Sequence, residues 1–152
     1  MNTAIEILLV EDNPNDIELT LHAFKKNHIA NSVHIARDGA EALDFIFGDG
    51  ANGGDQSLRL ILLDLKLPKV DGIEVLRKLK GDPRTRDIPV VVLTSSNQER
   101  DVAESYRLGV NSYIVKPVDF VQFNEVIKAL GWYWLVLNQA PPALKGDGPC
   151  NR

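Results

Sequence analysis

Residues 59–72 read RLILLDLKLPKVDG, an apolar run that stops at an acid, Asp64. Three other apolar runs also end on groups suited to phosphate chemistry: 5–10 on Glu11 and Asp12, 90–93 on Thr94, and 113–115 on Lys116. Parallel strands place their carboxyl ends at one edge of a sheet, where open α/β folds bind ligands. We therefore expect three carboxylates, one hydroxyl and one ammonium group to gather in a single crevice.

Short β-branched runs alternate along the chain with amphipathic segments of helical length, a pattern typical of βαβ units. The predicted strands cover residues 5–10, 32–36, 59–63, 90–93 and 112–115, with the second strand at an edge. A capping residue precedes each predicted helix and is followed, three positions on, by an acid or amide: Asn13 and Asp16, Asp38 and Glu41, Asp71 and Glu74, Ser96 and Glu99, Asp119 and Gln122. The pattern predicts an α/β fold, a doubly wound five-stranded parallel sheet with five helices.

The composition predicts one domain, residues 1–139, followed by a disordered tail, residues 140–152. The 152 residues are 44% hydrophobic, which is enough for a sizeable core. A net charge of −4 argues against a nucleic-acid surface, which normally carries a concentrated basic patch. The single cysteine, Cys150, excludes an internal disulfide and fits a reducing compartment. Because we find neither a signal peptide nor an apolar run long enough to span a bilayer, we expect a cytoplasmic protein that does not enter membranes.

The acids at the predicted strand ends indicate a site for a hard cation. A third carboxylate beside Glu11 and Asp12 would suffer like-charge repulsion unless a cation neutralises the cluster, and oxygen ligands suit Mg²⁺. Asp64 is the best candidate nucleophile, since a carboxylate can attack phosphorus to form an acyl phosphate. The Thr94 hydroxyl can donate to a phosphoryl oxygen, and the Lys116 ammonium can act on it as a point charge.

Simpler interpretations stand beside these. A single acid after a strand often caps the next helix, and Ser96 is best explained as a helix start because Glu99 completes a capping box. Tyr113 is more often a packing residue than a switch. The isomer of the Lys116–Pro117 bond stays open, because cis is the minority form at about 5% of such bonds.

The assembled residues resemble the receiver domain of bacterial two-component response regulators over residues 4–138. The matching elements, in chain order, are Glu11-Asp12, Asp64 with Pro68 and Gly72 in DLKLPKVDG, Thr94, Tyr113, and Lys116-Pro117. An ordered set in its fold context is more specific than any single motif. The resemblance implies a flavodoxin-like receiver fold with strand order 2-1-3-4-5.

The resemblance also implies a role for each matching residue. Asp64 would accept a phosphoryl group from a histidine kinase or a histidine phosphotransfer protein. Mg²⁺ would be held by Asp12, Asp64 and the backbone carbonyl of Lys66, with Glu11 helping through water. Lys116 and Thr94 would bind the phosphoryl oxygens, and Tyr113 would turn inward as Thr94 moves. The chain would then be a phosphoacceptor rather than an enzyme, with slow Mg²⁺-dependent self-phosphorylation and dephosphorylation.

One position departs from the pattern often seen in the family. Lys66, two residues after Asp64, replaces an asparagine or a small polar residue. Its carbonyl can still bind metal, but its side chain leaves the lifetime of the phosphorylated state open.

The chain ends soon after the fifth helix, so we expect a stand-alone receiver that signals through protein contacts. The last helix carries a core stripe at helical spacing: Phe123, Val126, Ile127, Leu130, Trp134 and Leu137. Further apolar residues lie outside that stripe and predict an interface: Trp132, Tyr133, Leu135 and Val136. We expect a homodimer through the fourth helix, last strand and fifth helix, although these side chains could also fold back on their own domain. The glycine-rich loop at residues 48–57 and the aromatic last helix resemble those of receivers paired with phytochrome-type kinases.

Three other functions compete with this interpretation. A flavin-binding flavodoxin needs a hydroxyl- and amide-rich phosphate cradle after the first strand, where this chain has Glu11, Asp12 and Asp16. A phosphatase of the haloacid dehalogenase type needs a second acid two residues after the nucleophile, where this chain has Lys66. A receiver-like module that binds partners without phosphorylation stays open, and phosphorylation dependence would separate it from the main interpretation.

Overall fold

The computed structural model describes residues 5–48, 58–139 and 141. Its sheet contains five strands in the described part of the chain: β1 (Ile7–Val10), β2 (Val33–Ala36), β3 (Leu60–Leu63), β4 (Val90–Thr94) and β5 (Ser112–Val115). All neighbouring strands pair in parallel, in the order β2-β1-β3-β4-β5. The predicted strand order and the edge position of the second strand are confirmed. The predicted tail and glycine-rich loop fall almost entirely outside the described residues.

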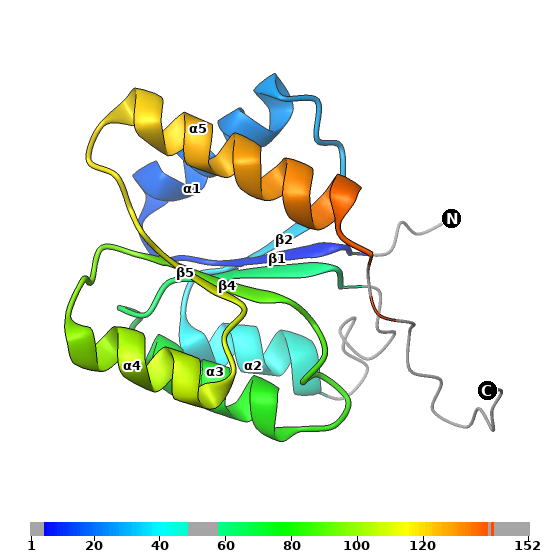
Figure 1. Ribbon diagram of the computed structural model, residues 1–152. Coiled ribbons are helices and arrows are strands. Elements are labelled where there is room, and N and C mark those ends of the chain that lie inside the picture. The colour runs from blue at the N-terminus through cyan, green and yellow to red at the C-terminus, as the bar shows by residue number, and fades with distance from the viewer. Residues whose placement is uncertain (1–4, 49–57, 140, 142–152) are drawn as a thin grey trace, which may run out of the picture.

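The helices cover both faces of this sheet. They are α1 (Pro14–Lys26), α2 (Gly39–Phe47), α3 (Gly72–Gly81), α4 (Glu99–Leu108) and α5 (Phe120–Gly131), and α5 continues into a π-helix, η2 (Trp132–Leu137). Figure 1 shows α1 and α5 on one face and α2, α3 and α4 on the other. No described helix has the length and hydropathy needed to cross a bilayer.

Two apolar layers hold the helices to the sheet. Ile7 and Leu9 of β1 face the layer beneath α1 and α5, whereas Leu8 and Val10 face the layer beneath α2 and α3. Successive side chains of a strand point to opposite faces, so a strand covered on both sides needs an unbroken apolar run. This arrangement explains why the chemical groups occur only where the runs end.

Four of the five predicted helix starts are confirmed. Asn13, Asp38, Asp71 and Asp119 each accept a hydrogen bond from a backbone N–H in the first turn of the helix that follows. Ser96 is not the cap of α4, because that helix begins at Glu99 after Gln98. The Ser96 hydroxyl instead donates to Asp101 Oδ2 at 2.5 Å, and its carbonyl accepts from the Tyr113 hydroxyl at 2.9 Å. These contacts hold Ser96 in the turn that follows β4.

The predicted stripe of the last helix is wrong at its end. In η2 the Asn138 N–H donates to the Tyr133 carbonyl at 2.6 Å, five residues back. The wider turn changes the helical register, so Leu135 becomes buried and Leu137 is left 70% exposed. Leu135 is therefore a core residue rather than the interface residue that we predicted. Trp132, Tyr133 and Val136 are exposed, as the sequence indicates.

Candidate functional site

The predicted groups meet at the carboxyl edge of the sheet. Glu11 and Asp64 follow β1 and β3, and the Asp64 N–H donates to the Val10 carbonyl at 3.0 Å. Lys116 follows β5, and its N–H donates to the Thr94 carbonyl at 2.7 Å. These bonds continue the sheet ladder past the strand ends. The crevice groups are therefore fixed by the same backbone that forms the core.

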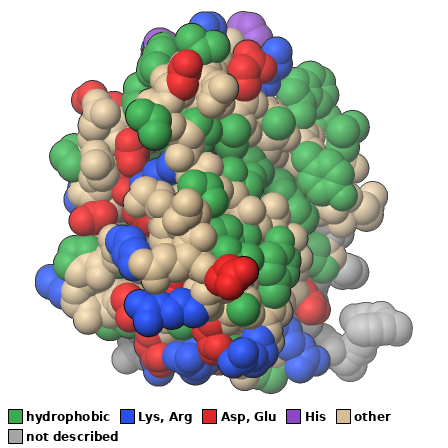
Figure 2. Space-filling view, turned by 60° about the vertical axis from the view of Figure 1, so that its left-hand side comes forward, with side chains coloured by type: hydrophobic (Ala, Val, Ile, Leu, Met, Phe, Trp, Pro, Cys, Tyr) green, Lys and Arg blue, Asp and Glu red, His purple; other side chains and the backbone are tan. Residues whose placement is uncertain are grey.

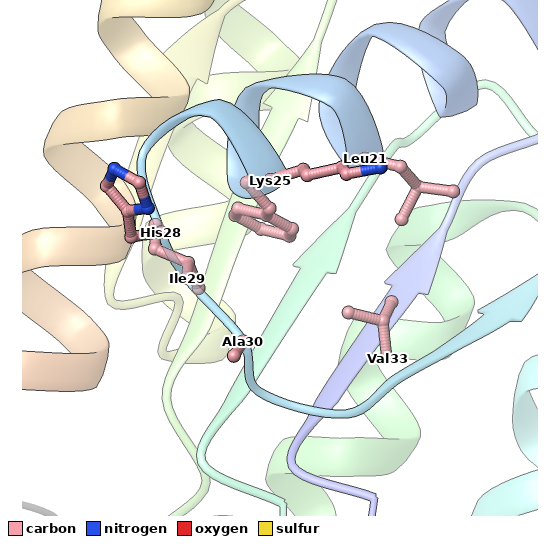
Figure 3. A pocket seen from close by; sticks show the side chains of 7 residues that line it. Leu21, Lys25, His28, Ile29, Ala30 and Val33 are labelled. Carbon is pink, nitrogen blue, oxygen red and sulfur yellow. The ribbon is translucent and has the colours of Figure 1, made fainter.

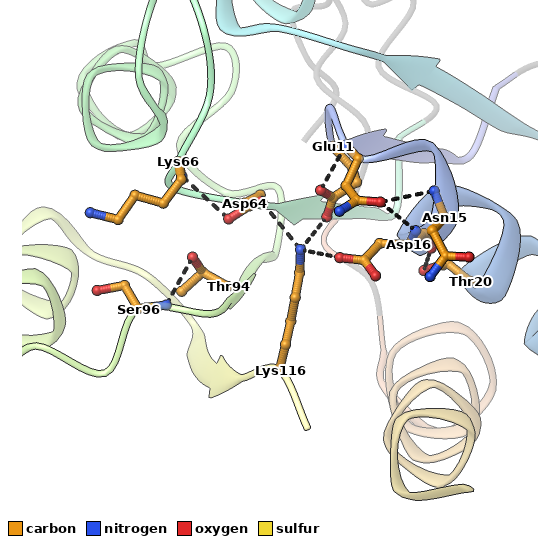
Figure 4. Close-up of polar contacts among 10 residues, drawn as sticks. Glu11, Asn15, Asp16, Thr20, Asp64, Lys66, Thr94, Ser96 and Lys116 are labelled. Carbon is orange, nitrogen blue, oxygen red and sulfur yellow. Dashed lines mark hydrogen bonds and ion pairs between the residues drawn. The ribbon is translucent and has the colours of Figure 1, made fainter. Parts of the chain in front are cut away.

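Lys116 lies at the centre of the crevice. Its Nζ contacts Glu11 Oε1 at 2.7 Å, Asp16 Oδ2 at 2.8 Å and Asp64 Oδ2 at 3.2 Å, and its side chain is only 10% exposed (Figure 4). The three hydrogens of an ammonium group can thus each meet a carboxylate. The Lys116–Pro117 bond is trans, as are all described peptide bonds.

Asp16 is a crevice residue that the sequence analysis did not assign to the site. It appeared there only as part of a helix start and as one of the acids after the first strand. A signal was present, because Asp16 lies in the first turn of the helix that directly follows Glu11 and Asp12. No local pattern, however, links Asp16 to a lysine 100 residues away.

The three carboxylates predicted to lie at the metal site are close together. One carboxylate oxygen from each of Glu11, Asp12 and Asp64 lies within 4.8 Å of the others. An all-oxygen set of this kind fits a hard divalent cation such as Mg²⁺, Mn²⁺ or Ca²⁺. Lys66 adjoins the cluster, because its N–H donates to Asp64 Oδ1 at 3.3 Å. Asp12 and Lys66 also line a hollow of about 470 Å³ that extends to Asp101.

Burial and charge perturb the groups in the crevice. Burial raises the pKa of Glu11 to about 7; the charge of Asp64 acts in the same direction, and the hydrogen bond from Lys116 opposes it. Burial acts to lower the pKa of Lys116, but hydrogen bonds to Asp16 and Glu11 outweigh it and raise that pKa above its ordinary value. Lys116 is therefore a permanent cation, whereas Glu11 titrates near neutral pH when no metal is bound.

This raised pKa predicts how the metal-free protein responds to pH. The folded state holds the Glu11 proton up to about pH 7, whereas the unfolded chain releases it near pH 4.5. The folded state therefore binds more protons in this window, so the Glu11 contribution to the free energy of unfolding falls as the pH rises through it. Denaturant titrations of wild type and Glu11→Gln in chelator should show a pH-dependent difference between pH 4.5 and 7. If the free energies of unfolding of the two proteins changed equally with pH, the raised pKa of Glu11 would be contradicted.

Thr94 and Tyr113 are linked through the turn after β4. Thr94 is fully buried, and its hydroxyl oxygen accepts from the Ser96 N–H at 3.4 Å. Tyr113 packs against the layer beneath α2 and α3 while its hydroxyl donates to the Ser96 carbonyl. In this structure Tyr113 thus already lies against the core. A shift of Thr94 would therefore move Ser96, and the movement of Ser96 would change its hydrogen bond with Tyr113.

A separate hollow of about 390 Å³ lies at the far end of α1 (Figure 3). It is mainly apolar and is lined by Leu21, Phe24, Lys25, His28, Ile29, Ala30 and Val33. No carboxylate lines it. It is therefore not part of the acidic crevice, which begins at the opposite end of the same helix.

Comparisons with known proteins indicate the family of this chain. The family model of the response regulator receiver domain matches residues 7–128. The probable methanogenesis regulatory protein FilR2 of Methanothrix harundinacea is 43% identical over 136 residues, which cover 89% of this chain and 86% of FilR2. The response regulator Rcp1 of Synechocystis sp. is 40% identical over 137 residues, which cover 90% of this chain and 93% of Rcp1.

Solved structures show the same similarity. The phosphorylated cyanobacterial phytochrome response regulator RcpA has a TM-score of 0.85 and 40% identity, covering 92% of this chain and 100% of that chain. The Mn²⁺-bound form of Rcp1 has a TM-score of 0.83 and 37% identity, covering 91% and 99%. The family indicated by the sequence is thus confirmed by fold and similarity together. This chain belongs to the response regulator receiver domain family of two-component systems.

Proposed function

We propose that Asp64 accepts a phosphoryl group from a phosphohistidine of a sensor histidine kinase or a histidine phosphotransfer protein. The Asp64 carboxylate attacks phosphorus, a P–O bond forms, the P–N bond breaks, and the imidazole leaves and takes up a proton. The observation that carries the proposal is the contact of a nearly buried ammonium with a nearly buried carboxylate, Lys116 Nζ to Asp64 Oδ2 at 3.2 Å. A cation fixed beside the nucleophile can stabilise charge on the incoming oxygens.

Mg²⁺ is the cation that we propose for the acidic cluster. Asp12, Asp64 and the Lys66 carbonyl would hold it, with Glu11 acting through water. The fit rests on the oxygen ligands within 4.8 Å and on the relative Rcp1, whose structure contains Mn²⁺. The ion would supply positive charge for the transferring phosphoryl oxygens. Asp64 itself would be consumed in each transfer and regenerated by hydrolysis, so the chain acts as a relay component rather than as a turnover enzyme.

Phosphorylation would act through charge on a two-state surface. The phosphoryl group adds about −1.5 to −2 charges and three acceptors, which favour a new arrangement of Lys116 and Thr94. The Thr94–Ser96–Tyr113 contacts support a path from the phosphoryl site towards α4 and β5. The output would be a protein contact on that side of the molecule.

The first test is uptake of phosphoryl groups by the wild-type protein. After incubation with Mg²⁺ and acetyl phosphate, intact mass spectrometry should detect one phosphoryl adduct. Addition of excess chelator should suppress it. If no adduct forms under conditions that modify a control receiver, the chain is instead a receiver-like module that binds partners without phosphorylation.

We also propose a phytochrome-type histidine kinase as the donor. Support comes from the similarity to RcpA, a phytochrome response regulator. FilR2 has a similar sequence identity but is named as a methanogenesis regulatory protein. Transfer rates from purified kinases should therefore be compared directly. We expect the phytochrome-type kinase to phosphorylate this chain faster than a non-cognate kinase does.

A homodimer is the proposed assembly, with η2 at its centre. Trp132, Tyr133, Val136 and Leu137 are each at least half exposed. Figure 2 shows hydrophobic side chains gathered on the upper and right-hand parts of the molecule, with most charged side chains below and to the left. Exposed aromatic clusters of this kind are typical of interfaces.

Substitution at this surface should dissociate the dimer. Trp132→Asp is expected to weaken self-association by about tenfold or more, because a charge would replace an aromatic side chain that the proposed dimer buries. Light scattering coupled to gel filtration measures the change. Ala40→Asp is the control, since Ala40 is exposed on α2, which contacts β2 at the opposite edge of the sheet from β5. Equal effects of the two substitutions, or a wild-type monomer at all concentrations, would contradict the proposed interface.

A further inference from the structure

Asp16 differs from the other two carboxylates that contact Lys116. Glu11 and Asp64 belong to the cluster that can hold a cation, whereas Asp16 does not. A cation at the cluster therefore competes with Lys116 for two of its three partners. Asp16 is the partner that would still be available to the ammonium.

The local structure of α1 turns the Asp16 carboxylate towards Lys116. In a capping box, the acid at this position would accept from the N–H of the capping residue. Here the Asn13 N–H donates to Glu11 Oε2 at 3.2 Å, while the Asn13 side chain caps the Asp16 N–H at 3.1 Å. The Asp16 carboxylate is thus anchored through its backbone and still free to bind the ammonium at 2.8 Å (Figure 4).

Charge explains why this contact matters for the cluster. Without Asp16, the buried ammonium would have only Glu11 and Asp64 as carboxylate partners. The ammonium would then occupy carboxylate oxygens that a divalent cation needs. The ammonium and the cation, both positively charged, would compete for the same oxygens. With Asp16 present, Lys116 can keep a close counter-ion at the α1 side of the crevice.

We propose that Asp16 is a positioning residue, which holds Lys116 at the start of α1 and so leaves Glu11 and Asp64 available to a divalent cation. The inference rests on the cation-dependent function proposed above. It assigns a role to a residue that contacts Lys116 and stands outside the ligand cluster.

The first experiment measures Mn²⁺ affinity by titration calorimetry on the full chain. Asp16→Asn should weaken binding by about fivefold, the scale of one lost close charge pair. Glu18→Gln removes the same charge from an exposed position two residues along α1 and should change the affinity less than about twofold. In a Lys116→Met background, the effect of Asp16→Asn should shrink to the Glu18→Gln level. An equal effect in both backgrounds, or none in either, would overturn the inference.

The second experiment follows the Lys116 ammonium directly in the wild-type protein. An ammonium held by carboxylates exchanges its protons slowly, so its ¹H–¹⁵N signal should be visible in wild type, assigned by its absence in Lys116→Met. We expect the signal to persist when Mg²⁺ is added, because Asp16 retains the ammonium. Its loss on Mg²⁺ addition would overturn the inference.

The outcomes separate this inference from the proposed function. If wild type takes up the phosphoryl group but Asp16→Asn binds Mn²⁺ normally, only the role of Asp16 fails. If wild type binds Mn²⁺ with the expected pattern but never takes up the phosphoryl group, only the phosphoacceptor function fails. Absence of cation binding by wild type would overturn both.

Discussion

Asp64→Asn should abolish the phosphoryl adduct, which is the largest effect that we expect from any single substitution. An amide is too weak a nucleophile to form the acyl phosphate. The Asp64 carboxylate contacts the Lys116 ammonium through Oδ2 and accepts from the Lys66 N–H through Oδ1. Intact mass spectrometry after treatment with acetyl phosphate and Mg²⁺ measures the loss. The adduct should fall below detection.

Two controls separate this loss from unfolding and from a general charge effect. The charge of Asp64 helps to raise the pKa of Glu11, so its removal relieves repulsion and should leave the melting temperature unchanged or higher. Asp101→Asn removes an acid from the hollow that Asp12 and Lys66 line, but not from the metal cluster, and the variant should still form the adduct. Adduct formation by Asp64→Asn would require another acceptor.

Gly72→Ala should cause a large loss of stability at a position that contacts the backbone of Asp64. A Cβ at Gly72 would lie 2.3 Å from the Asp64 carbonyl oxygen and 2.5 Å from Leu65 Cα, both backbone atoms. The loop that carries Asp64 must then move, so we expect a loss of about 2 kcal/mol in the free energy of unfolding. Denaturant titration measures this loss, and the rate of acetyl phosphate uptake should fall with it.

The same helix offers a matched control for Gly72. At Gly81, the last residue of α3, a Cβ would meet no heavy atom within 4 Å other than those of its chain neighbours and of the helix backbone nearby. Gly81→Ala should therefore be neutral or stabilising by up to about 1 kcal/mol, since alanine favours the helix over glycine. A Gly72→Ala protein as stable and as reactive as wild type would show that the loop yields without effect on Asp64.

Much of the crevice could be predicted from the sequence because parallel strands end at one edge. Once the apolar runs are recognised as parallel strands, the residues that follow them must meet, as Glu11, Asp64 and Lys116 do. Helix starts were predictable where a single capping residue precedes each helix. The prediction was wrong at Ser96, where several adjacent polar residues could begin α4. Contacts with Asp101 and Tyr113 hold Ser96 in the turn before the helix.

Two features could not be predicted, for different reasons. Leu135 is buried in the core and Leu137 is exposed because η2 is a π-helix. A stripe drawn with 3.6 residues per turn cannot predict this change of register. The contact of Asp16 with Lys116 joins residues 100 positions apart and uses a carboxylate that the capping pattern had assigned elsewhere. Both features depend on tertiary contacts or backbone geometry that local patterns do not encode.

Identification of the phosphorylated residue would show directly whether Asp64 is the acceptor. The protein would be treated with acetyl phosphate and Mg²⁺, the acyl phosphate reduced with borohydride, and the modified residue located by tandem mass spectrometry of its peptides. We predict that Asp64 alone is reduced, to homoserine. Reduction at Glu11, Asp12 or Asp16 in place of Asp64, or at no residue while a control receiver is modified, would contradict it.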